Sequence, residues 1–125
     1  MKGSFLIYVG SVLIFGWGLA HLLPTRKVVQ GFGDISADNK RTMTMEWINE
    51  GATLMFIGIL IMLVTHIDRT NTISHAVYWS AFAMLNTMSL ISLFTGFKNS
   101  FIPFKLCPFI FSGSSLLIIL GSCWH

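Results

Sequence analysis

The residues of this sequence whose types and spacing suit chemistry are one histidine and two glutamates beside hydrophobic segments. Glu46 and Glu50 are four residues apart, which places them on one face of a helix, and His21 lies near the end of the preceding hydrophobic segment. Two carboxylates at this spacing repel each other, and at the edge of a low-dielectric medium one is expected to hold its proton more tightly than a free glutamate. We therefore predict that Glu50, Glu46 and His21 form an acid/base cluster.

Position singles out Glu50 as the functional carboxylate. It is expected one helical turn, ~5.4 Å, deeper in the membrane than Glu46, and an ionised group at that depth has a cost unless something pairs it or uses it. Histidine, glutamate and tryptophan are also ordinary residues of helix ends in the headgroup layer, so each member alone has a structural interpretation. Trp17 and Trp47 are predicted interface anchors that also suit the walls of an apolar ligand pocket.

The loop after the first hydrophobic segment adds Asp34 and Asp38 as candidate ligand-binding residues. Swung toward His21, either aspartate would complete a set of one nitrogen and several oxygens, which suits iron, manganese or zinc. The sequence lacks the Glu-x-x-His and His-x-x-x-His pairs that helical metal bundles use. It also lacks phosphate-loop, haem-attachment and dinucleotide motifs, so we predict no cofactor and keep a metal site as an alternative.

Two further residue types interrupt the hydrophobic segments. Asn86 lies near the middle of the third segment, where an amide seeks a partner across a helix interface for a gain of about 0.6–2 kcal/mol. Packing is its favoured role, and ligand binding is the alternative. Cys107 and Cys123 fall in one predicted helix, roughly 24 Å apart at ~1.5 Å per residue, so they cannot form a disulfide with each other.

These residues lie in or beside segments that the composition predicts to cross a membrane. The chain of 125 residues is 54% hydrophobic and 10% charged, whereas a soluble domain carries about 25% charged residues. Four long runs lack Asp, Glu, Lys and Arg, and each is near the ~20 residues that span the hydrocarbon. Lipid requires backbone groups to be paired within the segment, which favours helices. We predict one all-α domain, a bundle of four transmembrane helices near residues 4–23, 42–67, 73–97 and 103–124.

The first run also has features of a secretory signal. Lys2 precedes the apolar stretch, and the small residues Gly18 and Ala20 lie near its end. We favour a membrane span, because removing this segment would leave three spans without the helix that carries His21.

A long connection, residues 24–41, separates the first two predicted spans. Its length exceeds the usual helix–helix linker of about 2–8 residues, which is typical of a functional or disordered segment. Gly31–Asp34 predicts a turn in which glycine takes positive φ. We expect this turn to fold back over the helix ends, because Phe32 and Ile35 would otherwise be exposed to water.

The second span is expected to begin as a helix near Lys40, with Asp38 or Asn39 as its N-cap. Its first two turns would then stand in the headgroup region. The short polar loop 68–74 makes the second and third helices antiparallel neighbours, and Pro103 suits the start of the fourth helix.

Basic residues predict the orientation of the chain. On the side of the first and third loops lie Arg26, Lys27, Lys40, Arg41, Lys98 and Lys105. The opposite side has only Lys2 and Arg69. The positive-inside rule therefore places loops 24–41 and 98–105 in the cytoplasm and both termini outside.

The sequence is compatible with three functions. The first is an enzyme or binding protein that handles a lipophilic small molecule from the bilayer by acid/base chemistry at Glu50, Glu46 and His21. The second is proton-coupled export by a dimer, because four short spans with one membrane-embedded carboxylate resemble the layout of small multidrug-resistance transporters. Those proteins carry their essential glutamate in the first helix, which has no acidic residue here.

The third possibility is an accessory or scaffold subunit whose polar residues serve only assembly. Membrane lipid, a lipophilic small molecule and a second copy of the chain are the expected partners. The eight Lys and Arg residues form no basic stripe, which excludes nucleic acid.

Overall fold

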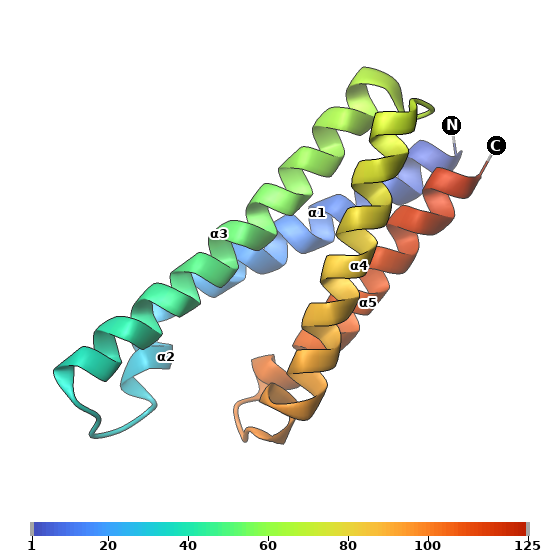
Figure 1. The fold of residues 1–125 in the computed structure, drawn as a ribbon. Coiled ribbons are helices and arrows are strands. Elements are labelled where there is room, and N and C mark those ends of the chain that lie inside the picture. Colours follow the sequence, from blue (N-terminus) through green and yellow to red (C-terminus); the bar gives the residue numbers. More distant parts are fainter. Residues whose placement is uncertain (1, 125) are drawn as a thin grey trace.

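The computed structural model describes residues 2–124, a range that contains helices and no strand (Figure 1). The elements are α1 (Lys2–Leu22), α2 (Thr25–Gln30), α3 (Ala37–Asp68), α4 (Thr72–Phe94), the 3-10 turn η1 (Gly96–Lys98) and α5 (Ile102–Cys123). Helices α1, α3, α4 and α5 are long and apolar enough to cross a membrane. The predicted all-α bundle of four long helices is confirmed, and these helices fit a small multi-pass membrane protein.

The four long helices do not close into a symmetrical bundle. Helix α1 packs against both α3 and α5, and α5 also packs against α4, whereas α3 and α4 share few contacts. Figure 1 shows both termini and the α3–α4 turn at one end, and the pair α1–α3 diverging from the pair α4–α5 toward the other. Helices α3 and α4 were expected to be antiparallel neighbours. Instead, α3 packs mainly against α1, and α4 packs mainly against α5. This leaves the α3–α4 side of the molecule open.

Inward-facing residues recur at alternating steps of four and three. In α3 the buried residues are Trp47, Gly51, Leu54, Gly58, Ile61 and Thr65. A 3.5-residue repeat is typical of helices that pack at a small left-handed crossing angle. Small residues let the backbones approach: a Cβ added at Gly58 would lie 2.7 Å from the carbonyl oxygen of Ser11 on α1.

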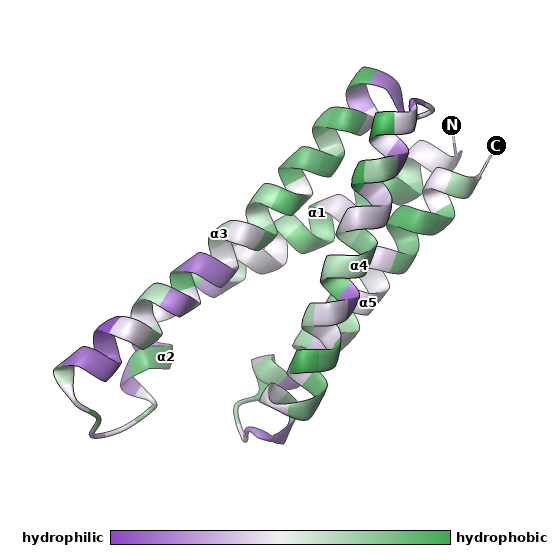
Figure 2. Cartoon of the chain, in the orientation of Figure 1, coloured by the Kyte–Doolittle hydropathy of each residue, from purple (hydrophilic) through white to green (hydrophobic). Residues whose placement is uncertain are grey.

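The interior of the bundle is not more apolar than its outside. The buried polar residues are Ser11, His21, Thr65, Ser74, Ser89, Ser114, Ser115 and Ser122. Large apolar side chains such as Phe5, Phe56 and Phe94 point outward. Figure 2 shows hydrophilic residues gathered at the start of α3 and at the α3–α4 turn, with apolar residues along the helices between. This distribution is expected where lipid, not water, surrounds the helices.

The connection 24–41 is more ordered than predicted. It contains α2, and its Val28 and Val29 are each 8% exposed. The expected turn follows, with Gly33 at φ +75°. Phe32 is 37% exposed and Ile35 is half-buried, so the fully buried apolar contact of this connection comes from the valines of α2.

Helix α3 begins earlier than predicted. Ser36 is its N-cap, and the Ser36 hydroxyl accepts a hydrogen bond of 3.2 Å from the backbone N–H of Asn39. The prediction of Asp38 or Asn39 as the cap, with a start near Lys40, is therefore wrong, because serine at this position satisfies a free N–H equally well. Helix α3 has 32 residues, or ~48 Å at ~1.5 Å per residue, so it extends beyond a ~30 Å hydrocarbon layer.

Candidate functional site

A close crossing of α1 and α3 brings His21 and Glu50 together. A Cβ added at Gly18 would lie 2.6 Å from the carbonyl oxygen of Gly51, and one added at Gly51 would lie 2.9 Å from that of Gly18. The two glycines thus allow the helix backbones to touch. His21 follows Gly18 by about one turn, and Glu50 directly precedes Gly51. The crossing therefore positions both side chains.

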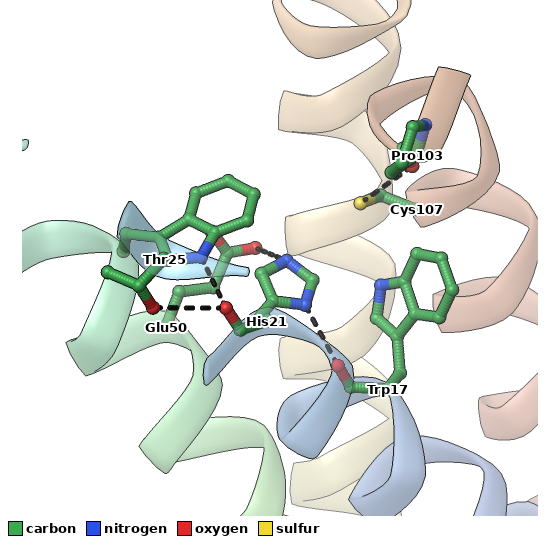
Figure 3. Close-up of polar contacts among 7 residues, drawn as sticks. Trp17, His21, Thr25, Glu50, Pro103 and Cys107 are labelled. Carbon is green, nitrogen blue, oxygen red and sulfur yellow. Dashed lines mark hydrogen bonds and ion pairs between the residues drawn. The ribbon is translucent and has the colours of Figure 1, made fainter. Parts of the chain in front are cut away.

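His21 is 4% exposed and its ring is fixed by two tryptophans. Its Nδ1 lies 2.9 Å from the carbonyl oxygen of Trp17, one turn earlier on α1 (Figure 3). The ring stacks on Trp47 of α3, with 4.7 Å between centroids and 29° between planes. The indole Nε1 of Trp47 donates a hydrogen bond to the carbonyl oxygen of His21. These contacts leave only Nε2 free to face another group.

That group is Glu50, whose Oε1 lies 3.6 Å from His21 Nε2 (Figure 3). A carbonyl oxygen can only accept, so Nδ1 must carry the hydrogen that bonds to Trp17. In a neutral imidazole, Nε2 would then present a lone pair to a carboxylate oxygen, and the two would repel. One proton between Nε2 and Oε1 removes this repulsion, as an imidazolium beside a carboxylate or as a carboxyl beside a neutral imidazole.

Glu50 also lines a cleft of about 540 Å³ between the first half of α3 and the second half of α4. The polar lining consists of Thr42, Glu46, Asn49, Glu50 and Thr53. The rest of the lining is apolar and comes from Val28, Val29, Phe32, Met43, Trp47, Met84, Met88 and Phe104. Small-molecule sites in proteins typically measure about 300–1,000 Å³, with a few polar groups in a mainly apolar wall. The volume and lining of this cleft fit that description.

The cleft lies between the two diverging helix pairs and is lined by residues from both. Phe104, at the start of α5, contacts Trp47 of α3 edge to face, with 5.4 Å between ring centroids. Glu46 is exposed, and the Glu50 side chain is 33% exposed although its partner His21 is buried. Glu50 is thus the member of the pair that a bound molecule can reach.

Trp17 contacts the edge of His21 at 5.7 Å and does not line this cleft. Its Nε1 is buried without a hydrogen-bond partner within residues 2–124. Cys107 of α5 is buried beside this tryptophan, and its Sγ donates to the carbonyl oxygen of Pro103 at 3.5 Å (Figure 3). The structure places Trp17 behind the histidine as support and adds Cys107 to the same end of the bundle.

The two loop aspartates lie apart from the cluster. Asp38 forms an ion pair of 3.1 Å with Arg41 and its side chain is 90% exposed. Asp34 is exposed in the turn before α3. Between residues 2 and 124 no three His, Cys, Asp or Glu side chains are close enough to share a metal ion. The arrangement supposed for a metal, with an aspartate swung toward His21, is therefore not formed.

Asn86 has a structural environment. Its Nδ2 donates to the carbonyl oxygen of Phe82 at 2.8 Å and to Ser115 Oγ of α5 at 3.0 Å. Asn86 is not among the residues that line the cleft. The amide therefore joins α4 to α5, in agreement with the packing role that was favoured over ligand binding.

Several cleft residues could not be assigned from the sequence. Met84 and Met88 resemble any other methionine in a lipid-embedded helix. Phe104 follows Pro103 at the start of α5, where nothing in the sequence indicates contact with Trp47 of α3. Val28 and Val29 form an apolar pair in a polar connection. This pattern was the one sign in the sequence that they pack against the bundle.

Comparisons with known proteins leave the site as the only guide to function. No model of a protein family matches the chain, and neither curated proteins nor solved structures show significant similarity to it.

Proposed function

We propose that the protein binds a lipophilic small molecule in the cleft between α3 and α4 and exchanges a proton with it at Glu50. The observation that carries this proposal is the buried His21 held 3.6 Å from a carboxylate that lines the cleft. A proton donor and acceptor inside a mainly apolar cavity is the combination that acid/base handling of such a molecule needs.

Each residue has a distinct part in the proposal. Glu50 is the catalytic residue, because it alone of the pair faces the cavity. His21 is a positioning residue that keeps a proton beside Glu50 and, through its bond to Trp17, keeps Nε2 directed at the carboxylate. Glu46 lies one turn nearer to water and serves as the exposed proton acceptor. Trp47 and Phe104 form the aromatic wall of the cleft.

A second cavity supports entry from the bilayer. An apolar groove of about 330 Å³ lies farther along the same α3–α4 side, lined by residues that include Ile57, Leu60 and Val77. Met84 lines both the groove and the cleft. A hydrocarbon tail in the groove would therefore continue into the cleft that holds Glu50.

The packed core favours a site served from one membrane face over a pump open to both. Fully buried apolar residues fill the bundle on the other side of the cluster: Ile7, Ile14, Leu54, Ile61, Leu85, Phe111 and Ile118. A proton-coupled transporter would need Glu50 to be reachable through this layer. We place the cleft at the cytoplasmic face, on the basis of the basic residues in the flanking loops.

Photolabelling tests the proposal. The full chain in neutral detergent would be illuminated with an alkyl alcohol that carries a diazirine in its tail, and labelled peptides would be mapped by mass spectrometry. We expect label on α3 and α4 around Thr53 and Met84. Met84→Trp should remove this label by filling the cleft, since Met84 is 47% exposed and tolerates a larger side chain.

Leu90→Trp is the matched control, because Leu90 is also an exposed residue of α4 (57%) and does not line the cleft. It should retain the label. Label distributed evenly over the lipid-facing residues of all four long helices, or label unaffected by Met84→Trp, would contradict the proposed site.

A further inference from the structure

We infer that the molecule bound in the cleft is a lipophilic amine with a single hydrocarbon chain, whose nitrogen lies between the carboxylates of Glu46 and Glu50. This inference rests on the proposed function and adds the chemical class of the ligand. It is carried by the charge of the cleft, by its aromatic wall and by the proton of the His21–Glu50 pair.

The charges that line the cleft are both negative. Glu46 and Glu50 are the only charged residues of its lining, which includes no Lys or Arg. A ligand carboxylate or phosphate would meet these two acidic groups without a basic partner in the cavity wall. A cationic head would be attracted by both glutamates, and its attraction would be strengthened by the apolar surroundings.

The aromatic wall also suits a cation. Trp47, Phe104 and Phe32 line the same cleft as Glu46 and Glu50. An ammonium group over the face of an aromatic ring is attracted by the ring quadrupole, most strongly with tryptophan. Carboxylates and aromatic rings in one cavity form a combination that recognises ammonium ions.

The proton of the His21–Glu50 pair can be transferred to the amine nitrogen. A neutral amine dissolves in lipid more readily than its ammonium form, because a charged group is costly in hydrocarbon. In the cleft, the lone pair of the amine nitrogen takes the proton held between His21 and Glu50. The N–H bond forms as the bond from that proton to Oε1 or Nε2 breaks, which leaves the ammonium beside the Glu50 carboxylate, where its positive charge offsets the repulsion between that carboxylate and the neutral His21 Nε2. The acid/base pair thus converts a lipid-soluble base into a bound cation.

A zwitterionic phospholipid is the competing occupant. Its ammonium would meet the same glutamates, but its phosphate would need a basic partner. Lys27 lines an adjacent cavity with Asn99 and Ser100 and does not line the cleft. The apolar groove that shares Met84 with the cleft has a volume of about 330 Å³ and suits one hydrocarbon chain. These features favour the single-chain amine.

Three photoreactive probes with the same diazirine tail test the inference: an alkylamine, an alkyl alcohol and an alkyl carboxylate. Binding to the full chain in dodecyl maltoside would be measured from the concentration dependence of cleft labelling. We expect the amine to bind at least about tenfold more tightly than the alcohol, the scale of one hydrogen bond to a charged group, and the carboxylate to bind more weakly still.

Variants locate the preference. Glu46→Gln and Glu50→Gln should each lower the ratio of amine binding to alcohol binding toward one. Asp38→Asn, which removes an exposed carboxylate of the same helix outside the cleft, should leave the tenfold preference intact. Competition with unlabelled dodecylamine should displace the amine probe, and nanodiscs of phosphatidylcholine should displace it no better than nanodiscs of phosphatidylglycerol.

Equal binding of amine and alcohol would overturn the amine inference, as would a preference that survives both glutamine variants or selective displacement by phosphatidylcholine. In each of these cases alcohol label in the cleft would leave the proposed function standing. Absence of cleft label with every probe would remove the proposed function together with the inference.

Discussion

The two ends of the bundle differ in whether their polar side chains are paired with other helices or face a cavity. At the terminal end, which holds both termini and the α3–α4 turn, the Tyr78 hydroxyl lies 2.8 Å from Thr65 Oγ1 and the Ser74 hydroxyl donates to the carbonyl oxygen of Asp68 at 2.6 Å. Arg69 reaches the carbonyl oxygen of Gly121 on α5. At the cleft end, Glu46 and Glu50 face a cavity instead.

Under the proposed function, this difference separates polar groups that hold the bundle together from polar groups that bind a ligand. A polar group in lipid is costly unless a partner satisfies it. The terminal end satisfies such groups with interhelical and backbone bonds, and the helices converge there. The cleft end has carboxylates beyond what packing needs, at the place where the helix pairs diverge. We therefore expect substitutions at the terminal end to change stability, and those at the cleft end to change binding.

The largest stability effect is expected for Gly121→Ala at the terminal end. Its new Cβ would lie 2.5 Å from the carbonyl oxygen of Gly3 and 2.9 Å from the backbone nitrogen of Ile7, so α1 and α5 would have to separate. We expect a loss of about 3 kcal/mol, measured by unfolding in mixed detergent micelles. Gly113→Ala in the same helix is the control, because nothing lies within 4 Å of its Cβ position. Similar losses for the two variants would show that this helix contact is not tight.

A smaller loss is expected for Tyr78→Phe. The tyrosine side chain is fully buried, and the substitution removes its 2.8 Å bond to Thr65 without altering the ring. Thr65 keeps its bond to the carbonyl oxygen of Ile61. We expect about 1 kcal/mol in the same unfolding assay. A stability equal to that of the parent chain would mean that the terminal end does not depend on this bond.

Glu50→Gln should cost less stability than Tyr78→Phe. The Glu50 side chain is one-third exposed, so solvent weakens its interaction with His21, and glutamine keeps its shape and a donor for Nε2. We expect a change below about 0.5 kcal/mol together with loss of the preference for the amine over the alcohol. A loss of stability as large as that of Gly121→Ala would make Glu50 a structural residue and erase the contrast between the two ends.

The smallest effect is expected for Asp38→Asn at the start of α3. The ion pair with Arg41 is almost fully exposed, and such pairs contribute little. Unfolding and probe binding should both match the parent chain within error. A clear change in either would show that the part of α3 beyond the membrane contributes to the cleft.

The sequence was sufficient to predict the four long helices, because a long uncharged run in lipid satisfies its own backbone hydrogen bonds by forming a helix. It also predicted that His21 and Glu50 meet, since both lie near one membrane face on consecutive helices. Residues of α2 were assigned to a loop, because a six-residue helix gives too short a pattern to recognise. The start of α3 was misplaced because Ser36, Asp38 and Asn39 are all good caps, and tertiary structure selects among them.

The cleft could not be predicted from the sequence. Outward and inward faces of these helices are similarly apolar, so hydrophobicity does not indicate which face of α4 carries Met84 and Met88. Gly18 and Gly51 let the backbones of α1 and α3 touch. Neither glycine can be recognised as a contact residue until the helix that faces it is known. Which helix pair stays apart depends on all of these contacts together.

The proton between His21 and Glu50 is the central claim, and nitrogen NMR of the imidazole tests it most directly. The full chain, with 15N-labelled histidine, would be studied in lipid bilayers near neutral pH, and His21 would be assigned by comparison with His21→Gln. We predict that Nδ1 is protonated and hydrogen-bonded to the Trp17 carbonyl oxygen, and that Nε2 is either protonated or accepts a hydrogen bond from the Glu50 carboxyl group, so that its signal shifts on Glu50→Gln. A neutral ring with hydrogen on Nε2 and a bare Nδ1, unchanged in Glu50→Gln, would contradict this prediction.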